Sequence, residues 1–339
     1  MKAAVFSQLH SPLSVADVPT PTTDRYSVLL KVCRCGICGS DLHMTEDPVF
    51  GIKQGDILGH EFSGEVIEVG SGVTGLKAGD FVSSAPLYGC GECDSCRRGD
   101  PAWCANMKLQ GGGYAQYASV TERQCRKLPW GISPTDGALA EPLSVALHGL
   151  MRSGLRPGQR VAVVGAGAIG LAVAFWARRM GAAQVAVLDL HAFQEERAME
   201  LGATSFLSGT EDVSARLMAQ LGSLPDIVFE CVGSPGLIDH CIDLVRPRGT
   251  VVVLGLCTKP DHLNSFRAIC KEVNVVMSVF FDMHEFNAAI GALDSGAFAP
   301  QALVSETISL DRLPDSFEAL KKRTTQCKVL VDPFGLQAA

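Results

Sequence analysis

The sequence predicts an α/β protein of two domains, one rich in short strands and one built on a doubly wound parallel sheet of six strands. Its 339 residues exceed what one ordinary hydrophobic core accommodates. The first 130 residues contain short β-like runs that turn residues interrupt often. From about residue 155, short apolar runs alternate with helical patterns, which is typical of parallel strands joined by helices on both faces.

The strands expected in the first part are VLLKV (28–32), GEVIEVG (64–70) and YAQYASV (114–120). Turn signals such as Ser71-Gly72 separate them, so this part should form an irregular, strand-rich domain. The six strands expected in the second part are VAVVG (161–165), VAVLD (185–189), TSFLS (204–208), DIVFE (226–230), TVVVLG (250–255) and VNVVMSV (273–279). Six is the strand count of a complete dinucleotide-binding (Rossmann) fold. A helical stretch follows residue 284, and KVLV (328–331) is a last expected strand.

Composition excludes several classes of protein. The net charge of −7 and the absence of a basic block argue against nucleic-acid binding. The apolar stretch 161–177 is interrupted by three glycines and ends at Arg178-Arg179, so we expect no membrane span. The amino terminus lacks the apolar region of a signal peptide, which favours a soluble cytoplasmic protein. Thirteen cysteines in such a chain favour metal binding over disulfides.

VAVVGAGAIG has the G-x-G-x-x-G spacing at Gly165, Gly167 and Gly170, directly after an expected strand and before a helix-compatible run. The first glycine permits a tight turn, the second lets the backbone approach a pyrophosphate, and the third lets helix and strand pack closely. Ala168 and Ile169 complete this candidate phosphate loop at the helix start, where amide groups face anions. The alternative is a doubly wound domain that binds no nucleotide.

Asp189 ends the second expected strand, nineteen residues after Gly170, where an acid hydrogen-bonds the adenosine ribose. Leu190 follows it as a further candidate cofactor contact, and no arginine occurs until Arg197. Because a carboxylate there repels a 2′-phosphate, we expect NAD rather than NADP.

Four cysteines, Cys90, Cys93, Cys96 and Cys104, lie at C-x2-C-x2-C-x7-C spacing. Four thiolates on one loop suit a closed tetrahedral zinc site that holds the loop's shape. An iron–sulfur cluster also uses four thiolates, but nothing else in the sequence indicates electron transfer.

CGICGSDLH (35–43) raises the question of a second metal. Cys35 and Cys38 have the spacing of a redox pair or half a zinc knuckle, whereas Cys38 and His43 could equally ligate together. His60-Glu61 alone is usually a polar pair, and Glu141 in EPLSV could simply begin a helix. These residues by themselves leave the alternatives open.

Five motifs together resemble a known family. GICGSDLH, GHEFSGEV, the four-cysteine loop, AEPLSVALH and VAVVGAGAIG occur in the order and spacing of the zinc-dependent medium-chain dehydrogenases/reductases. The EPLSV motif makes the sorbitol, or polyol, branch the most similar. The resemblance implies a GroES-like catalytic domain over 1–148 with its zinc loop at 89–105. It also implies a Rossmann NAD-binding domain over 149–283 and a return to the catalytic domain over 284–339.

The resemblance also implies roles for the site residues. Cys38 and His60 would be ligands of a catalytic zinc, and Glu61 and Glu141 would compete for the remaining protein position. Ser40 and His43 would form the start and end of a proton relay. Cys33 and Cys35 match no ligand position and are expected to be small buried side chains.

The implied activity is NAD-dependent oxidation of a secondary alcohol, such as a polyol, sugar acid or diol, by an enzyme with two zinc ions per chain. The segment between Cys104 and Gly112 is shorter than in relatives, where it borders the substrate cleft. This departure leaves a bulkier cyclic secondary alcohol as an alternative substrate. A silent zinc-binding structural or regulatory protein is the alternative of another class. Relatives pair through the edge of the Rossmann sheet, so a homodimer or homotetramer is expected.

Overall fold

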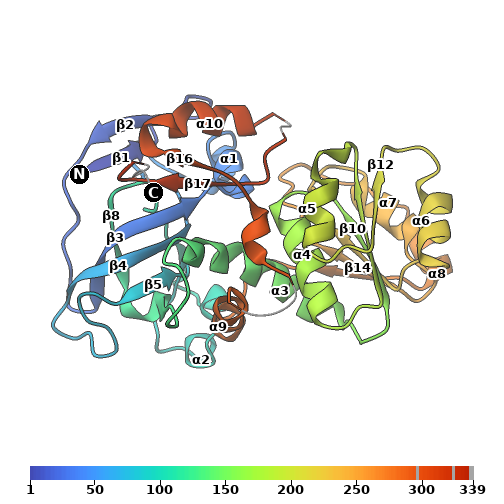
Figure 1. Cartoon of the computed structure of the whole chain (residues 1–339), viewed down its shortest axis with the longest axis horizontal. Coiled ribbons are helices and arrows are strands. Elements are labelled where there is room, and N and C mark those ends of the chain that lie inside the picture. Colours follow the sequence, from blue (N-terminus) through green and yellow to red (C-terminus); the bar gives the residue numbers. More distant parts are fainter. Residues whose placement is uncertain (295–297, 323–324, 336–339) are drawn as a thin grey trace. The chain divides into compact units, whose positions relative to one another are not determined.

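The computed structural model describes residues 1–294, 298–322 and 325–335 and divides into two compact units (Figure 1). Unit 1 contains Met1–Glu141, Asp282–Asp294 and Val304–Ala339, and unit 2 contains Pro142–Phe281 and Ser295–Leu303. Unit 2 therefore begins seven residues earlier than the sequence suggests and also takes in a short later segment.

Unit 1 is strand-rich, as its sequence predicts. Its strands are β1 (Lys2–Val5), β2 (Ser14–Asp17), β3 (Ser27–Gly36), β4 (Glu61–Val69), β5 (Phe81–Ser84), β6 (Leu87–Tyr88), β7 (Lys108–Leu109), β8 (Tyr117–Thr121), β9 (Cys125–Lys127), β16 (Val304–Ser309) and β17 (Lys328–Asp332). Its helices are α1 (Gly39–Met44), η1 (Pro48–Phe50), α2 (Asp94–Arg97), η2 (Pro101–Trp103), η3 (Glu122–Gln124), η4 (Asp136–Leu139), α9 (Met283–Ala292), η7 (Leu310–Arg312) and α10 (Leu313–Leu320). Helix α3 (Ala140–Ser153) carries the chain into unit 2.

The main sheet of unit 1 has the order β16-β17-β3-β4-β5-β9, with β8 also paired to β3. Strand β17, from the end of the chain, pairs antiparallel with the end of β3, and β3 pairs antiparallel with β4. Strand β8 begins three residues later than the expected run. The backbone of Tyr114 is instead engaged by Leu58 and Ala4. The core lies against this sheet and includes Phe62 and Tyr114.

Unit 2 is a doubly wound α/β domain. Its strands are β10 (Arg160–Val164), β11 (Gln184–Asp189), β12 (Ser205–Ser208), β13 (Ile227–Glu230), β14 (Thr250–Val253) and β15 (Asn274–Met277). Its helices are α4 (Ala168–Arg179), η5 (Ala192–Gln194), α5 (Glu195–Glu200), α6 (Val213–Leu221), α7 (Leu237–Leu244), α8 (Ser265–Lys271) and η6 (Pro300–Leu303).

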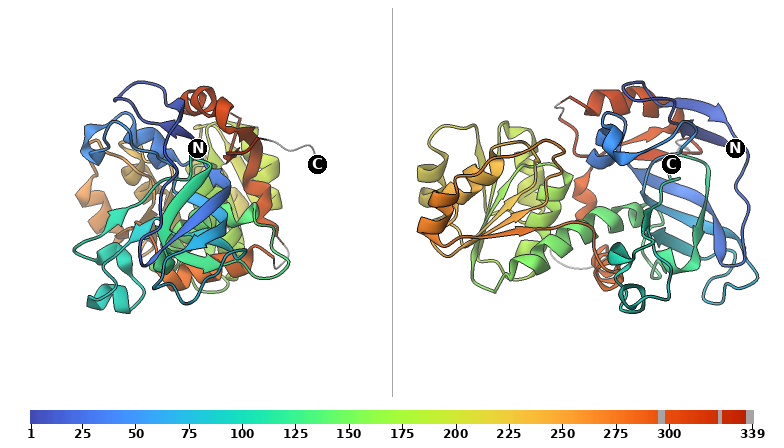
Figure 2. Two further views of the ribbon diagram at one scale, coloured as in Figure 1. Left: turned by 90° about the vertical axis from the view of Figure 1, so that its left-hand side faces the viewer. Right: turned by 180° about the vertical axis from the view of Figure 1, so that it is seen from behind.

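All six expected strands are present and pair in parallel in the order β12-β11-β10-β13-β14-β15. Helices α4 and α5 cover one face, and α6, α7 and α8 cover the other (Figures 1 and 2). The inner strands β10, β11, β13 and β14 are largely apolar and buried because both of their faces are covered, whereas β15 at the edge is largely exposed. The strand order reverses between β10 and β13, the point at which this fold binds ligands. No helix among the described residues combines the length and apolar character needed to cross a membrane.

Candidate functional site

Cys38, His60 and Glu61 lie together in unit 1, with one ligand atom from each within 4.8 Å of the others. Cys38 caps the start of α1, His60 directly precedes β4, and Glu61 is the first residue of that strand. The pairing of Gly36 with Glu61 in the β3–β4 ladder brings the two segments together. A sulfur, an imidazole nitrogen and a carboxylate oxygen at this spacing fit a zinc ion with one coordination position left open.

Asp41 fixes the orientation of His60. Its Oδ1 lies 3.0 Å from Nδ1 of His60, and both side chains are buried. Burial alone would lower the pKa of His60, but the Asp41 carboxylate and Cys38 raise it well above its ordinary value. An Nδ1–H bonded to Asp41 leaves Nε2 as the atom able to bind a metal. Sequence reasoning missed Asp41, although it lies within the CGICGSDLH motif.

Ser40 lies beside this cluster, and His43 follows it in α1. The Ser40 hydroxyl lies 3.2 Å from Sγ of Cys38 and 3.4 Å from Nε2 of His60. His43 is exposed, one turn further along α1. Cys35 is buried, as expected, whereas Cys33 is half-buried. The pKa of each of these two thiols is raised, chiefly by burial.

Lys328 is a site residue that the sequence analysis did not identify. Its Nζ contacts both carboxylate oxygens of Glu61, at 2.7 and 2.6 Å, and donates to the Ile37 carbonyl at 3.0 Å. Both side chains are almost wholly buried. Burial alone would lower the pKa of Lys328, but the negative charge of Glu61 outweighs this and raises it. The lysine therefore remains charged and neutralises Glu61. Its partner is 267 residues away in the chain, so no local pattern reveals it.

Glu141, the second residue of α3, is also buried. Burial, together with the nearby charges of Glu61 and Asp41, raises its pKa to about 7, against the opposing effects of His60 and Lys328. A carboxyl group with this pKa can hold or release a proton near neutral pH. Glu141 does not belong to the metal-binding group of Cys38, His60 and Glu61.

The four cysteines converge as the spacing predicts. The Sγ atoms of Cys90, Cys93, Cys96 and Cys104 all lie within 4.8 Å of one another. Tetrahedral zinc with bonds of about 2.3 Å to sulfur needs sulfur atoms somewhat less than 4 Å apart, so the set fits. The backbone amides of Glu92 and Cys93 lower the pKa of Cys90 to about 6, whereas burial raises that of Cys96 to about 12. Backbone amides donate to the sulfur atoms of Cys90 and Cys104, which favours the thiolate form that zinc binds at these two positions.

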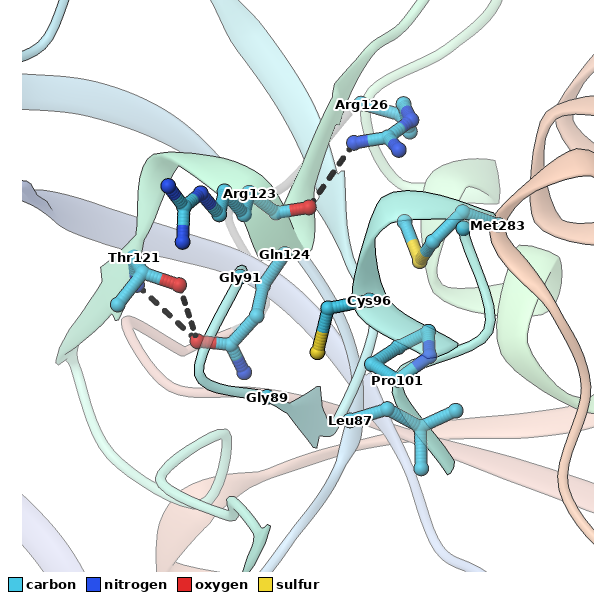
Figure 3. A pocket seen from close by; sticks show the side chains of 11 residues that line it. Leu87, Gly89, Gly91, Cys96, Pro101, Thr121, Arg123, Gln124, Arg126 and Met283 are labelled. Atoms are coloured by element: carbon cyan, nitrogen blue, oxygen red, sulfur yellow. Dashed lines mark hydrogen bonds between the residues drawn. The ribbon is translucent and has the colours of Figure 1, made fainter. Parts of the chain in front are cut away.

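A cavity of about 290 Å³ lies against this loop and away from the Cys38 cluster. Cys96, Pro101, Arg123, Arg126 and Met283 line it, together with the Thr121–Gln124 capping box (Figure 3). The Arg126 guanidinium donates to the Arg123 carbonyl, and Arg123 donates to the Cys90 carbonyl. These arginine contacts link the wall of the cavity to the four-cysteine loop. Because the polar groups already have partners in the chain, we assign the cavity no ligand.

The glycine loop of unit 2 has the geometry that its sequence predicts. Gly165 has a φ of +101°, which suits the tight turn after β10. A Cβ on Gly170 would collide with the Gly165 carbonyl, so the close helix–strand contact requires glycine there. Gly167 caps α4, which begins with Ala168 and Ile169.

Asp189 closes this loop from the end of β11. Its Oδ2 accepts a hydrogen bond from the Ala166 amide at 2.9 Å, and its Oδ1 accepts one from the His191 amide at 3.1 Å. The carboxylate is thus fixed beside the glycine loop, and Leu190 next to it is exposed. This arrangement supplies the anion-binding amides and the fixed acid that a dinucleotide needs.

Comparison with known proteins agrees with both units. The family model "Alcohol dehydrogenase GroES-like domain" matches residues 24–130, and "Zinc-binding dehydrogenase" matches 168–295. A (R,R)-butanediol dehydrogenase of Bacillus subtilis (strain 168) is 33% identical, with 98% of this chain and 100% of that protein covered. This chain belongs to the zinc-dependent medium-chain alcohol dehydrogenases. It is also 33% identical to the sorbitol dehydrogenase of Homo sapiens, over 93% of this dehydrogenase and 92% of that protein.

A solved relative shows the same architecture. The structure of a zinc-binding dehydrogenase from Sinorhizobium meliloti 1021 bound to NADP matches this dehydrogenase with a TM-score of 0.88 and 31% identity. The match covers 98% of this chain and 99% of that one. The expected family, its polyol branch and the two-part α/β fold are therefore confirmed.

In this dehydrogenase the segment between Cys104 and Gly112 contains β7. It pairs antiparallel with β6, and the Gln110 amide donates to the Pro86 carbonyl. The segment is thus hydrogen-bonded to the rest of unit 1.

Proposed function

We propose that this dehydrogenase oxidises a secondary alcohol of a polyol, a diol or a sugar acid to a ketone, with NAD as the hydride acceptor. The convergence of Cys38, His60 and Glu61 beside the Ser40 hydroxyl supports this proposal most directly. Relatives named for butanediol and sorbitol add support, since both molecules contain a secondary hydroxyl beside a second hydroxyl. A vicinal diol is thus the substrate unit that we favour.

Cys38, His60 and Glu61 would hold the catalytic zinc, which when bound supplies a Lewis acid that favours loss of the alcohol's proton. Glu61 is the third ligand that we favour over Glu141, since its oxygen lies within 4.8 Å of the other two ligand atoms. Lys328 neutralises Glu61 and so limits the negative charge of the ligand set. Glu141 would then exchange a proton near the substrate, as its pKa of about 7 permits.

Ser40 and His43 would carry the substrate's proton away. The Ser40 hydroxyl, beside Cys38 and His60, would accept the proton, and the exposed His43 would release it to solvent. We predict that His43→Ala lowers kcat about tenfold at pH 7 and less at pH 9, where hydroxide replaces the base. The exposed His262→Ala serves as a control. A parallel loss at both pH values would rule out the relay.

The glycine loop and Asp189 would bind NAD. The fixed Asp189 carboxylate beside the loop would repel the 2′-phosphate of NADP. We therefore expect kcat/KM to be higher with NAD than with NADP, and Asp189→Ala to reduce that preference. A higher kcat/KM of the wild-type enzyme with NADP would overturn this assignment.

Three further features complete the proposal. The four-cysteine loop would hold a second, structural zinc in each chain.

A homodimer would form through β15, the last strand of its sheet, whose Met277 is 60% exposed. A cytoplasmic location stays a prediction, and thiolate zinc ligands persist best in such a reducing compartment.

The decisive experiment measures NADH formation with a panel of vicinal diols, polyols, sugar acids and cyclic secondary alcohols. Turnover of the diol and polyol group, lost in the Cys38→Ser enzyme, is the expected result. Turnover limited to cyclic alcohols would replace the proposed substrate class. Silence across the panel in protein that holds two zinc ions per chain would contradict the proposal.

A further inference from the structure

The hydroxyl group of Tyr114 lies at the inner end of a hydrogen-bonded chain that leads to the metal-binding cluster. It donates to Oδ2 of Asp41 at 2.6 Å, while Oδ1 of Asp41 lies 3.0 Å from Nδ1 of His60. Tyr114 and Asp41 are fully buried, and His60 is 5% exposed. Each carboxylate oxygen of Asp41 thus has a different side chain as its partner.

We propose that Tyr114 is a positioning residue for the metal at Cys38 and His60, because its hydroxyl holds Asp41 in the orientation that fixes the His60 imidazole. The inference rests on the proposed catalytic zinc, but it concerns how tightly the chain holds the metal rather than which alcohol is oxidised. A carboxylate with one free oxygen could rotate and carry the imidazole with it. A carboxylate bound at both oxygens cannot rotate without breaking a buried hydrogen bond.

The backbone fixes Tyr114 relative to the segment that bears His60. The Tyr114 amide donates to the Leu58 carbonyl at 3.1 Å, and the Gly113 amide donates to the Gly59 carbonyl at 2.8 Å. On the other side, the Ala4 amide donates to the Tyr114 carbonyl at 2.8 Å. The tyrosine and the histidine therefore lie on adjacent backbone segments joined by hydrogen bonds.

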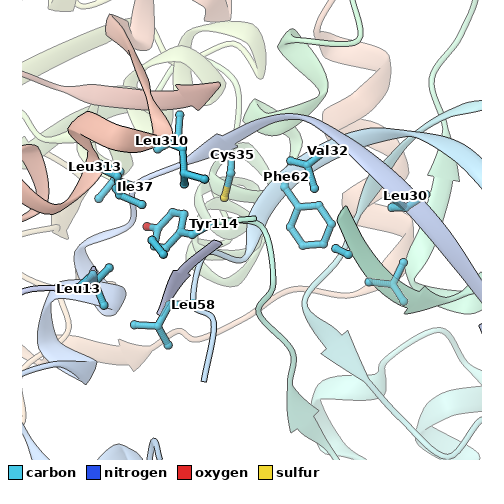
Figure 4. Packing of buried hydrophobic residues seen from close by; sticks show 14 of the residues in the cluster. Leu13, Leu30, Val32, Cys35, Ile37, Leu58, Phe62, Tyr114, Leu310 and Leu313 are labelled. Atoms are coloured by element: carbon cyan, nitrogen blue, oxygen red, sulfur yellow. The ribbon is translucent and has the colours of Figure 1, made fainter. Parts of the chain in front are cut away.

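The ring of Tyr114 is held equally closely. Gly59, next to His60, has a φ of +80°, and a Cβ there would lie 2.5 Å from the Tyr114 ring. The ring meets Phe317 edge to face at 6.3 Å. It lies in the apolar core of unit 1 with Cys35, Ile37, Leu58, Leu310 and Leu313 (Figure 4). The ring is thus closely packed, with its hydroxyl hydrogen-bonded to Asp41.

Burial, and then the charge of Asp41, raise the pKa of Tyr114 well above its ordinary value. The phenol therefore keeps its proton and remains a donor across the working range of pH. Phenylalanine would preserve the ring packing and remove only this donor. The position is consequently suited to an isosteric test.

The test compares wild-type enzyme, Tyr114→Phe and Tyr117→Phe, each loaded with zinc. Tyr117 lies on the adjoining strand β8, half-buried against Phe334, and serves as the matched control. We measure zinc content, release of zinc to a coloured chelator, and the absorption spectrum after replacement of zinc by cobalt(II). We expect Tyr114→Phe to release one of its two zinc ions about tenfold faster and to show a shifted cobalt spectrum. Tyr117→Phe should match the wild type.

Unchanged zinc release and an unchanged cobalt spectrum in Tyr114→Phe would overturn the role of Tyr114 and leave the proposed zinc dehydrogenase intact. Wild-type protein whose zinc content is the same as that of Cys38→Ser would overturn both. Should Tyr114→Phe fail to fold, wild-type protein labelled with 3-fluorotyrosine provides an independent measurement. The resonance of the solvent-shielded tyrosine should shift when the metal at Cys38 is removed, and an unmoved resonance would refute the coupling.

Discussion

Glu61 and Lys328 form a buried ion pair in which each charge depends on the other. In zinc-free protein, replacing Lys328 by methionine leaves the Glu61 carboxylate buried without a cation, which typically costs about 3–5 kcal/mol. We predict that Lys328→Met sharply lowers the denaturation midpoint of unit 1. The double variant Lys328→Met/Glu61→Gln should regain much of that loss, because no unpaired charge remains. Urea unfolding of the four proteins in this cycle tests the coupling, and additive losses would contradict it.

Individual site residues were the features that the sequence predicted least completely. Cys38 and His60 could be singled out because the CGICGSDLH and GHEFSGEV motifs surround them. Asp41 lies inside the first motif, so its bond to His60 could have been suspected. Lys328 and Tyr114 could not be found in this way, since their partners are distant in the chain and only the folded sheet brings them together.

We expect the four-cysteine loop to depend on a metal for its shape more than any other described segment does. Its helices α2 and η2 are short, and the strands β6 and β7 that flank it have two residues each. We predict that Cys96→Ser loses one zinc ion per chain and several degrees of Tm, since a structural zinc contributes directly to folding. Elemental analysis and calorimetry test this, with the exposed Cys270→Ser as control. Unchanged zinc content would show that the loop folds without metal.

The ion pair of Asp226 and Arg246 in unit 2 predicts how the stability of the protein depends on pH. Burial would raise the pKa of Asp226, but the Arg160 amide and the Arg246 guanidinium outweigh this and lower it. A carboxyl group with a lowered folded-state pKa stabilises the protein above its unfolded-state pKa of about 4 and loses this effect as the pH falls. Because the pair is partly exposed, we expect a contribution of about 1 kcal/mol.

Asp226→Asn tests this pair. Thermal unfolding at pH 7 should show a lower Tm for the variant than for the wild type. The difference should shrink as the pH falls below 4, where the wild-type carboxyl group becomes protonated. A difference that is independent of pH would assign the loss to packing rather than to charge.

The whole molecule should be an oligomer joined at β15. Strand β15 ends the six-stranded sheet, and apolar side chains are exposed on it and on α8, including Met277 and Ile269. Two copies related by a twofold axis would place these side chains against each other. We predict that Ile269→Lys/Met277→Lys yields monomers in size-exclusion chromatography with light scattering. Met218→Lys, on the exposed side of α6, should leave the mass unchanged. A wild-type protein that is already monomeric would refute the interface.

The architecture of the whole chain was more accessible to prediction than its side-chain partners. Alternation of apolar runs and helices predicted all six parallel strands of unit 2, because strands covered on both faces are uniformly apolar. The strands of unit 1 are more irregular and paired over long distances, so β8 and the pairing of β17 with β3 were harder to place. Local patterns report which face of an element is buried, and long-range pairing depends on the complete chain.

The position of β17 has a consequence for how this protein is made. Strand β3 lies near the start of the chain, yet it pairs with residues 330 and 331, and Glu61 finds its cation at residue 328. A ribosome therefore exposes Cys38 and His60 long before it synthesises the strand that completes their sheet. Unit 2 is contiguous from Pro142 to Phe281 and can fold during that interval. The main sheet of unit 1 must then remain incomplete, with the end of β3 unpaired on one side, until β17 has been synthesised.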